Sequence, residues 1–221
     1  KVIFYETSNE DRQMLSDMLK AYPDVQAEYL LDKLSADNIQ TAKNAEGISV
    51  FIHSSVNKKI LDALPNLRLI TTRSTGFDHI DVNYAKTKGI TVSNIPSYGS
   101  RTVAEFTFGL ILGLSRKIFQ AFRQVKDNHD FDISHFKGFD LFGKTLGVVG
   151  TGKIGQNVIQ IAKGFGMDVL GFDAFPNEGR AKELGFKYTK LDELLGSSDI
   201  VTLHVPYNKD THHLINSSNI A

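Results

Sequence analysis

The 221-residue sequence contains no cysteine and no tryptophan, and only five prolines. Without cysteine, disulfides and thiolate chemistry are excluded, which is typical of the reducing cytoplasm, and we predict a cytoplasmic protein. Long hydrophobic runs are also missing. The longest, 106–114, is interrupted by Thr107, Gly109 and Gly113, so it is too short to span a membrane. The chain begins with a strand-like run at 2–5, so no signal peptide is visible.

An excess of charge of one sign is lacking as well, because 25 Lys+Arg balance 25 Asp+Glu. No basic run is present that could follow a phosphate backbone, which excludes nucleic acid as an expected partner. Hydrophobic residues make up 41% of the sequence and charged residues 23%, as in ordinary globular proteins. These values predict a soluble protein that binds neither nucleic acid nor a membrane.

Short β-branched or aromatic runs alternate with helical stretches along the chain. This alternation predicts an α/β fold whose parallel sheets are covered on both faces. Before residue 95, strands are expected at 1–5, 25–30, 48–53, 67–72 and 90–92. Helical stretches are expected between them at 10–21, 37–44, 58–64 and 82–88, the first with Ser8 or Asn9 as its N-cap.

The turn-rich segment 95–100 interrupts this alternation and predicts a hinge between two domains, 1–98 and 99–221. A long helix is expected from 102 to about 127, with its apolar start buried between other elements. Further strands are expected at 146–149, 169–172, 186–188 and 200–205, and helices at 154–164, 180–184 and 192–195. A complete dinucleotide-binding fold has six strands. Because only four follow residue 145, we expect the second domain to be incomplete and the chain truncated at its C-terminus.

The most specific local motif is formed by Gly150, Gly152 and Gly155, which have G-x-G-x-x-G spacing between an apolar strand and a helix. The first glycine permits a tight turn, the second lets the backbone approach a pyrophosphate, and the third allows close packing of helix on strand. The helix N-terminus then offers N–H groups and a positive dipole end to the phosphates. The motif predicts a dinucleotide site, with ordinary turn chemistry as the alternative.

An acidic residue, Asp173, follows at the end of the next expected strand. A carboxylate there can accept hydrogen bonds from the adenosine ribose and repels a 2′-phosphate. The predicted cofactor is therefore NAD rather than NADP.

Four segments together carry a resemblance to a known family: 73–81, 98–105, 150–155, and 203–206 followed by Thr211. In order and spacing they resemble the D-isomer-specific 2-hydroxyacid dehydrogenases, especially the D-lactate dehydrogenase branch, over essentially the whole chain. The resemblance implies a flavodoxin-like substrate domain and a Rossmann-type NAD-binding domain, here incomplete, with the active site between them.

The resemblance also assigns substrate-binding residues. The backbone N–H groups of Thr75 and Gly76 would hold the substrate carboxylate, which suits a glycine-containing turn that an anion can approach closely. Tyr98 would lie over the substrate near the hinge. A plain turn at 75–76 and a packing role for Tyr98 are the alternatives.

The remaining cofactor-binding positions implied by the resemblance are Lys153, Ile154, His204, Val205, Pro206 and Thr211. The first two match the pair whose backbone meets the pyrophosphate, and the next three match the segment that ends the fourth strand against the adenosine. Thr211 matches a polar position lining the cofactor. For His204 we favour the alternative of a strand-end histidine without a role in proton transfer.

The family's catalytic arginine, carboxylate and histidine match sequence beyond 214–216, so we assign no catalytic residue here and expect the 221 residues alone to be inactive. We also assign no metal site. The adjacent His212 and His213 are expected to point in different directions, and no third ligand is evident.

The sequence therefore predicts an NAD-dependent oxidoreductase that transfers a hydride between NAD(H) and a small D-2-hydroxy acid or 2-keto acid, such as D-lactate and pyruvate. Relatives that act on glyoxylate, hydroxypyruvate, phosphoglycerate, formate or phosphite share these loops and stay open as alternatives. A different class is a non-catalytic NAD(H)-sensing interaction protein, as the family's transcriptional corepressors are. The resemblance and the apolar helix at 102–127 further predict a homodimer, although that helix could equally be core.

Overall fold

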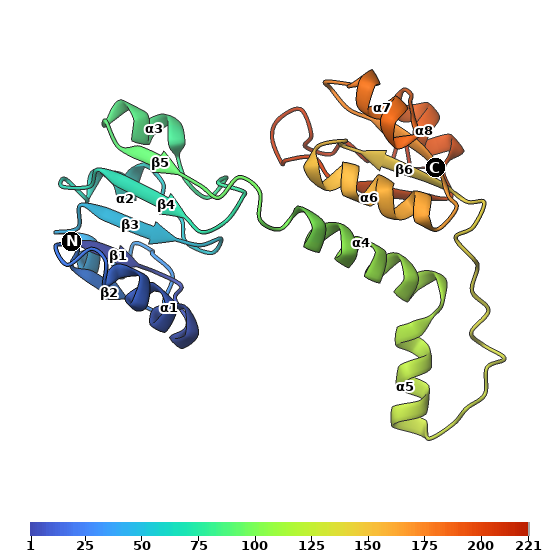
Figure 1. The fold of residues 1–221 in the computed structure, drawn as a ribbon, viewed down its shortest axis with the longest axis horizontal. Coiled ribbons are helices and arrows are strands. Elements are labelled where there is room, and N and C mark those ends of the chain that lie inside the picture. Colours follow the sequence, from blue (N-terminus) through green and yellow to red (C-terminus); the bar gives the residue numbers. More distant parts are fainter. Residues whose placement is uncertain (221) are drawn as a thin grey trace. The chain divides into compact units, whose positions relative to one another are not determined.

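The computed structural model describes residues 1–220, and the chain divides into two compact units, Lys1–Tyr98 and Gly99–Ala221 (Figure 1). Each unit has its own parallel sheet. Within the part of the chain described, no helix combines the length and the apolar character that crossing a membrane requires.

The first unit is built on a five-stranded parallel sheet in the order β2-β1-β3-β4-β5. This is the flavodoxin-like strand order, so the predicted fold class is confirmed for this unit. Its strands are β1 (Val2–Phe4), β2 (Ala27–Tyr29), β3 (Gly47–Val50), β4 (Leu69–Thr72) and β5 (Thr91–Ser93). Its helices are α1 (Asn9–Leu19), α2 (Lys58–Asp62) and α3 (Val82–Thr87).

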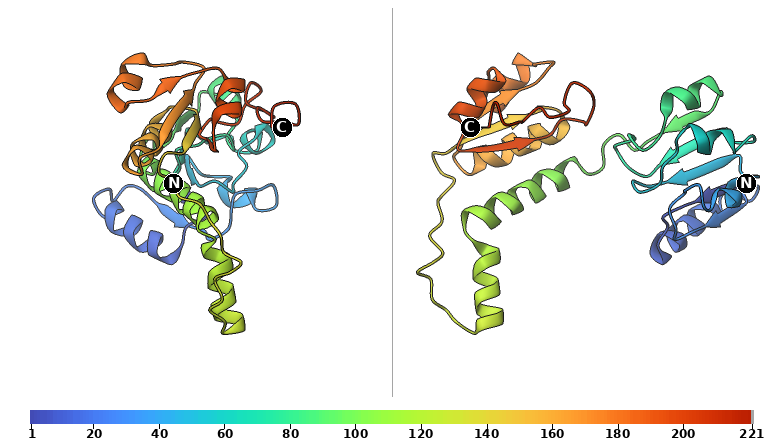
Figure 2. Two further views of the ribbon diagram at one scale, coloured as in Figure 1. Left: turned by 90° about the vertical axis from the view of Figure 1, so that its right-hand side faces the viewer. Right: turned by 180° about the vertical axis from the view of Figure 1, so that it is seen from behind.

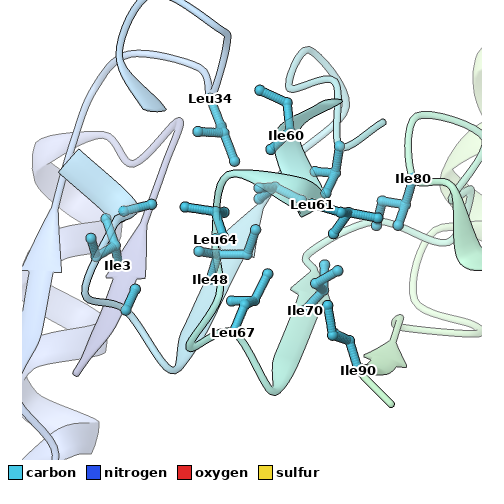
Figure 3. Close-up of a cluster of buried hydrophobic side chains, with 14 of the residues drawn as sticks. Ile3, Leu34, Ile48, Ile60, Leu61, Leu64, Leu67, Ile70, Ile80 and Ile90 are labelled. Atoms are coloured by element: carbon cyan, nitrogen blue, oxygen red, sulfur yellow. The ribbon is translucent and has the colours of Figure 1, made fainter. Parts of the chain in front are cut away.

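One face of this sheet forms the core of the unit. Ile3, Ile48 and Ile70 lie on three neighbouring strands and are completely or almost completely buried (Figure 3). Leu61 and Leu64, in and just after α2, close the cluster from above the sheet. Burying one such side chain contributes about 1.5–3 kcal/mol, so this cluster fixes the three strands whose ends carry the candidate site.

The prediction of a helix at 37–44 is wrong, because only a short 3₁₀ helix, η1 (Ile39–Ala42), forms there. Asn38 accounts for the difference. Its side chain accepts the Ser35 N–H over 2.9 Å and donates to the Lys33 carbonyl over 2.9 Å. Short polar side chains that bond to nearby backbone compete with helix formation in this way.

The second unit has a four-stranded parallel sheet in the order β8-β7-β6-β9. This order corresponds to strands 3-2-1-4 of a dinucleotide-binding fold, which confirms the Rossmann-type prediction. The strands are β6 (Thr145–Val149), β7 (Asp168–Phe172), β8 (Lys187–Tyr188) and β9 (Ile200–Leu203), the last shorter than the expected 200–205. The helices after them are α6 (Lys153–Gly164), α7 (Glu178–Leu184) and α8 (Leu191–Ser197).

The single helix expected at 102–127 is also wrong: the segment forms α4 (Ser100–Ser115) and α5 (Ile118–Asn128). Lys117 interrupts them with a left-handed backbone, φ 56°. The Ser115 carbonyl accepts the Phe139 N–H over 3.0 Å, so a returning segment takes the place of the next helical turn. Gly113 then receives the Phe119 ring, because a Cβ there would lie 2.5 Å from Phe119 Cε2.

The predicted burial of the start of this segment holds for one helix face only. Ala104, Phe108 and Ile111 are buried, and α4 packs along α6. The opposite face is exposed and carries Val103, Phe106, Leu110 and Leu114. In α5 no residue is buried, and the helix projects away from the sheet of its unit in every view (Figures 1 and 2).

Candidate functional site

The turn between β6 and α6 brings the backbone of the glycine motif into close contact with the residues that directly follow β9. Gly150 has φ +92°, and a Cβ there would lie 2.6 Å from the His204 carbonyl oxygen. A Cβ on Gly155 would overlap with the carbonyl oxygen of Gly150 itself. Because both positions lack space for a side chain, the tight turn from strand to helix requires glycine at each.

The start of α6 is the anion-binding element of this turn. Gly152 is the N-cap of α6, so no side chain occupies the first N–H groups, and a Cβ at this position would meet no atom within 4 Å. Lys153 and Ile154 begin the helix; Lys153 is exposed, and Ile154 packs on the core of the unit. A helix start with free N–H groups is suited to bind phosphate.

The chain after β9 borders the glycine turn. The His204 N–H donates to the Val149 carbonyl over 2.7 Å, and Val205 Cγ1 would lie 2.9 Å from a Cβ on Gly150. The structure therefore brings these predicted residues together with the glycine turn. Pro206 and Thr211 close the next loop, where the Thr211 hydroxyl donates to the Pro206 carbonyl over 2.5 Å.

The Asp173 carboxylate, at the end of β7, is hydrogen-bonded to the glycine turn. Asp173 Oδ2 accepts the backbone N–H of Thr151 over 2.6 Å and the Thr151 hydroxyl over 3.0 Å, while Oδ1 accepts the Phe175 N–H over 2.9 Å. Partial burial opposes ionisation, but these three bonds outweigh it and lower the pKa of Asp173. The carboxylate is thus held ionised and keeps lone pairs free for a further donor.

Two residues of this site, Thr151 and Tyr188, were missed at the level of sequence. The Thr151 side chain is buried between Asp173 and Tyr188, and its Oγ1 lies 2.7 Å from the Tyr188 hydroxyl oxygen. Thr151 occupies a variable position inside the motif, and Tyr188 lies in a strand of only two residues. The one signal in the sequence was a hydroxyl residue directly after Gly150.

In the first unit, Thr75 and Gly76 follow β4 at the carboxyl edge of the sheet. Thr75 Oγ1 donates to the Ile95 carbonyl over 2.9 Å, and Asn94 donates to the Thr75 carbonyl over 2.8 Å. Ser74 Oγ donates to the Gly76 carbonyl over 2.7 Å. Among residues 1–220 the N–H groups of Thr75 and Gly76 have no acceptor. Two exposed neighbouring N–H groups in a braced turn form a suitable site for a carboxylate.

Glu6 lies two residues after the end of β1, at the same edge of the sheet. Its carboxylate accepts the N–H groups of Phe51, His53 and Ser54 over 2.8–3.1 Å and also accepts the Ser54 hydroxyl. Burial opposes ionisation of Glu6, but these bonds outweigh it and lower its pKa. No motif in the sequence indicated this role for Glu6.

Arg73 ties the ends of the strands together directly before the predicted carboxylate turn. Its guanidinium donates to the carbonyls of Tyr5 and Glu6 over 2.7 and 2.8 Å and to Ser49 Oγ over 3.0 Å. The turn at 74–76 is therefore mounted on a cross-linked sheet edge.

The two partly buried histidines beside these loops bond to threonine rather than to a carboxylate. His79 Nε2 lies 3.2 Å from Thr72 Oγ1, and His204 Nε2 lies 2.9 Å from Thr202 Oγ1. Burial lowers the pKa of both imidazoles. Tyr98 is the last residue of the first unit, and 60% of its surface is exposed, so within its own unit it packs against little.

The expectation that His212 and His213 point in different directions is wrong. Their ring centroids lie 3.8 Å apart, and Tyr207 Oη lies 2.8 Å from His212 Nδ1. The positive φ of His213, 53°, turns its ring back onto its neighbour. Within 1–220 no group of three or more metal-ligating side chains is found, here or elsewhere.

Comparison with known proteins identifies the family. Residues 108–221 match the family model described as "D-isomer specific 2-hydroxyacid dehydrogenase, NAD binding domain", which is more than half of the chain. The chain belongs to the D-isomer-specific 2-hydroxyacid dehydrogenases. The predicted family is thereby confirmed, and the matched domain is the one that carries the glycine turn and Asp173.

Individual proteins to which the chain is similar support the same family assignment. The chain is 34% identical to a 2-hydroxyacid dehydrogenase homolog of Haemophilus influenzae, covering 98% of this chain and 65% of that protein. It is 33% identical to D-lactate dehydrogenase of Escherichia coli, and the match covers 99% of this chain and 66% of that protein. Among solved structures, D-lactate dehydrogenase from Aquifex aeolicus complexed with NAD and lactic acid has a TM-score of 0.88 and 41% identity, covering 99% and 65%. The chain thus spans 65–66% of the length of these relatives.

Proposed function

We propose that this dehydrogenase transfers a hydride between NAD(H) and a small D-2-hydroxy acid or 2-keto acid of the lactate and pyruvate type. The observation that carries the proposal is the glycine turn, with an uncapped helix start on one side and an ionised carboxylate, Asp173, bonded to it on the other. The similarity to D-lactate dehydrogenases, one of them solved with NAD and lactic acid, supports the substrate class.

The pyrophosphate and the adenosine part of NAD have proposed partners in the second unit. The N–H groups at the start of α6, from Lys153 and Ile154, bind the pyrophosphate. The Asp173 carboxylate accepts hydrogen bonds from the adenosine ribose. The loop of His204, Val205, Pro206 and Thr211 borders the adenosine. Bound NADH supplies the hydride, and the protein supplies position and charge.

The substrate carboxylate is proposed to bind the free N–H groups of Thr75 and Gly76. Two N–H donors at fixed spacing match the two oxygens of a carboxylate and add no charge that would need a counterion. Tyr98 is proposed to contact the rest of the substrate.

The proton donor is proposed to lie outside residues 1–220. Reduction of a keto acid requires a general acid, and an imidazole in that role is commonly paired with a carboxylate that stabilises its protonated form. His79 and His204 instead contact threonine hydroxyls, and burial lowers their pKa, so both favour the neutral form. Residues 1–221 alone are therefore expected to show no turnover.

We further propose a homodimer formed through α4 and α5. Exposed apolar side chains are found on both helices, and in α5 those of Ile118, Phe119, Phe122 and Val125 are each between 48% and 61% exposed. A group of large exposed apolar side chains is typical of a protein interface.

The first test of the function is cofactor binding. NADH fluorescence titration is expected to show binding that is tighter than that of NADPH. Asp173→Ala removes both the ribose hydrogen bonds and the repulsion of a 2′-phosphate, so the ratio of the two affinities should narrow by about tenfold or more. Asp168→Ala, at the opposite end of the same strand, is the control and should leave the ratio unchanged.

The second test is turnover. The full-length protein is expected to oxidise NADH with pyruvate, and glyoxylate and hydroxypyruvate are compared alongside. Failure of the wild-type protein to bind NADH would overturn the proposal. Binding of NADH without turnover of any of the three acids would instead support the non-catalytic, NAD(H)-sensing alternative.

A further inference from the structure

The Asp173 carboxylate ends a chain of hydrogen bonds that begins in the loop after β7 and passes through the side chain of Tyr188. Thr151 Oγ1 donates to Asp173 Oδ2 over 3.0 Å, and the same Oγ1 lies 2.7 Å from the hydroxyl oxygen of Tyr188. A hydroxyl group has a single proton to donate. Because Thr151 gives its proton to Asp173, the bond between the two hydroxyls must be donated by Tyr188.

The other end of the chain is fixed by the loop after β7. The Tyr188 hydroxyl oxygen accepts the Asn177 N–H over 3.2 Å, and Asn177 is itself held as the N-cap of α7. The order is therefore Asn177 N–H, Tyr188 hydroxyl, Thr151 hydroxyl and Asp173 carboxylate, each donating to the next. Hydrogen bonds linked in one direction polarise and strengthen one another.

Packing holds the Tyr188 ring independently of its hydroxyl. The ring makes an edge contact with Phe186, with centroids 5.0 Å apart, and Tyr188 pairs with Gly171 across β7 and β8. Gly171 leaves room for this arrangement, because a Cβ there would lie 2.6 Å from Phe186 and 3.2 Å from Thr151 Cγ2. A phenylalanine at position 188 would therefore keep the packing and lose only the hydrogen bonds.

We propose that Tyr188 is a positioning residue for the adenosine ribose, acting through Thr151 on Asp173, an inference that rests on the proposed function. The Tyr188 hydroxyl satisfies the Thr151 oxygen and directs the Thr151 proton to Asp173. The carboxylate is thereby locked in one rotation and presents its free lone pairs in one direction. A locked carboxylate binds ribose hydroxyls without losing further freedom and does not turn away from a 2′-phosphate. Tyr188 thus strengthens the preference for NADH over NADPH.

The charge around Tyr188 supports this role in selectivity. A pocket of about 420 Å³ beside Asp173 is lined by Tyr188, Lys190 and Glu193 as well. The Glu193 carboxylate accepts the Thr189 hydroxyl and is fixed there. Two carboxylates against one ammonium group make this space unfavourable for an added phosphate.

The test compares cofactor affinities of the wild type and Tyr188→Phe. The variant is expected to bind NADH about three- to tenfold more weakly, as for loss of one net hydrogen bond, and NADPH about equally well. Competition with AMP and adenosine 2′,5′-bisphosphate should show the same contrast, which places the effect at the ribose. Tyr84→Phe, which also loses a phenol hydrogen bond, to Asp62 over 2.6 Å, is the matched control and should change neither affinity.

A second comparison separates positioning from general damage. In an Asp173→Ala background, Tyr188→Phe should have no further effect on NADH affinity, and Thr151→Val alone should reproduce the Tyr188→Phe result. Equal weakening of NADH and NADPH, or an effect that persists without Asp173, would overturn the inference. If Tyr188→Phe fails to fold, Thr151→Val tests the inference in its place, because it interrupts the same chain of hydrogen bonds. Wild-type protein that does not bind NADH would instead refute the proposed function.

Discussion

At the scale of single residues, Glu6 shows how an unfavourable backbone conformation is compensated by side-chain contacts. Its φ of 52° lies in the left-handed region, where a residue with a Cβ loses about 1–2 kcal/mol. In return, its carboxylate accepts three backbone N–H groups and a hydroxyl, and its carbonyl accepts Arg73. The turn after β1 therefore depends on a charged hydrogen-bond acceptor at this position.

This dependence makes the stability of the protein sensitive to acid at Glu6. Because the folded-state pKa lies below the usual value of 4.5, the stabilisation by Glu6 is complete above that pH and is lost as the pH falls through the folded pKa. Glu6→Gln is expected to lower the free energy of unfolding by about 1–3 kcal/mol at neutral pH. The difference from wild type should shrink in acid.

Urea unfolding across the pH range measures this effect. Glu10→Gln, which changes an exposed carboxylate in the first turn of α1, is the control, and its effect should stay within about 0.5 kcal/mol. A difference between wild type and Glu6→Gln that does not vary with pH would contradict the argument.

Which site residues could be predicted depended on whether their role is local. Gly150 and Asp173 were predictable because the turn and the strand end define them within a short stretch of sequence. Thr151, Tyr188 and Glu6 act through partners 22 to 48 residues away. Such contacts form only when the sheet assembles, and no spacing of residues in the sequence predicts them.

At the scale of elements, strands and helices of the two sheets were predicted well because apolar periodicity and turn residues determine them. The break between α4 and α5 was not. The sequence has neither proline nor glycine at the break, and both helices continue one apolar pattern. The chain turns because the Phe139 N–H donates a hydrogen bond to the Ser115 carbonyl and the Phe119 ring fills the space next to Gly113. These are tertiary contacts that override local helix propensity.

Because Lys117 has a left-handed backbone at this break, glycine at this position should raise the free energy of unfolding. Lys117→Gly relieves the steric cost of the left-handed conformation, partly offset by greater freedom of the unfolded chain, for a net gain of about 0.5–1 kcal/mol. Gln120→Gly changes an exposed position inside α5 and should lower the free energy of unfolding by about the same amount. Thermal unfolding of the two variants measures the contrast, and destabilisation by Lys117→Gly would show that the lysine side chain has a role of its own.

At the scale of the whole molecule, the exposed apolar face of α4 and α5 predicts self-association. Light scattering of the wild type is expected to show a dimer at micromolar concentration. The double substitution Phe106→Lys and Phe122→Lys, at positions that are 67% and 61% exposed, places charge in the proposed apolar interface and should give a folded monomer. Met18→Lys, an equally exposed apolar position on α1, should leave the dimer intact. A wild-type monomer would argue against the proposed interface.

The crowding around the glycine turn also determines which substitutions evolution can sample. Side chains at 150 and 155 collide with backbone atoms whether or not a ligand is bound, whereas a side chain at 152 enters open space. In a library of variants sorted by cellular abundance, substitutions at Gly150 and Gly155 should be depleted and those at Gly152 retained. In the same library sorted by NADH binding, all three positions should be depleted. Gly152 would then be kept by selection for the ligand alone, and the other two glycines by selection for the fold.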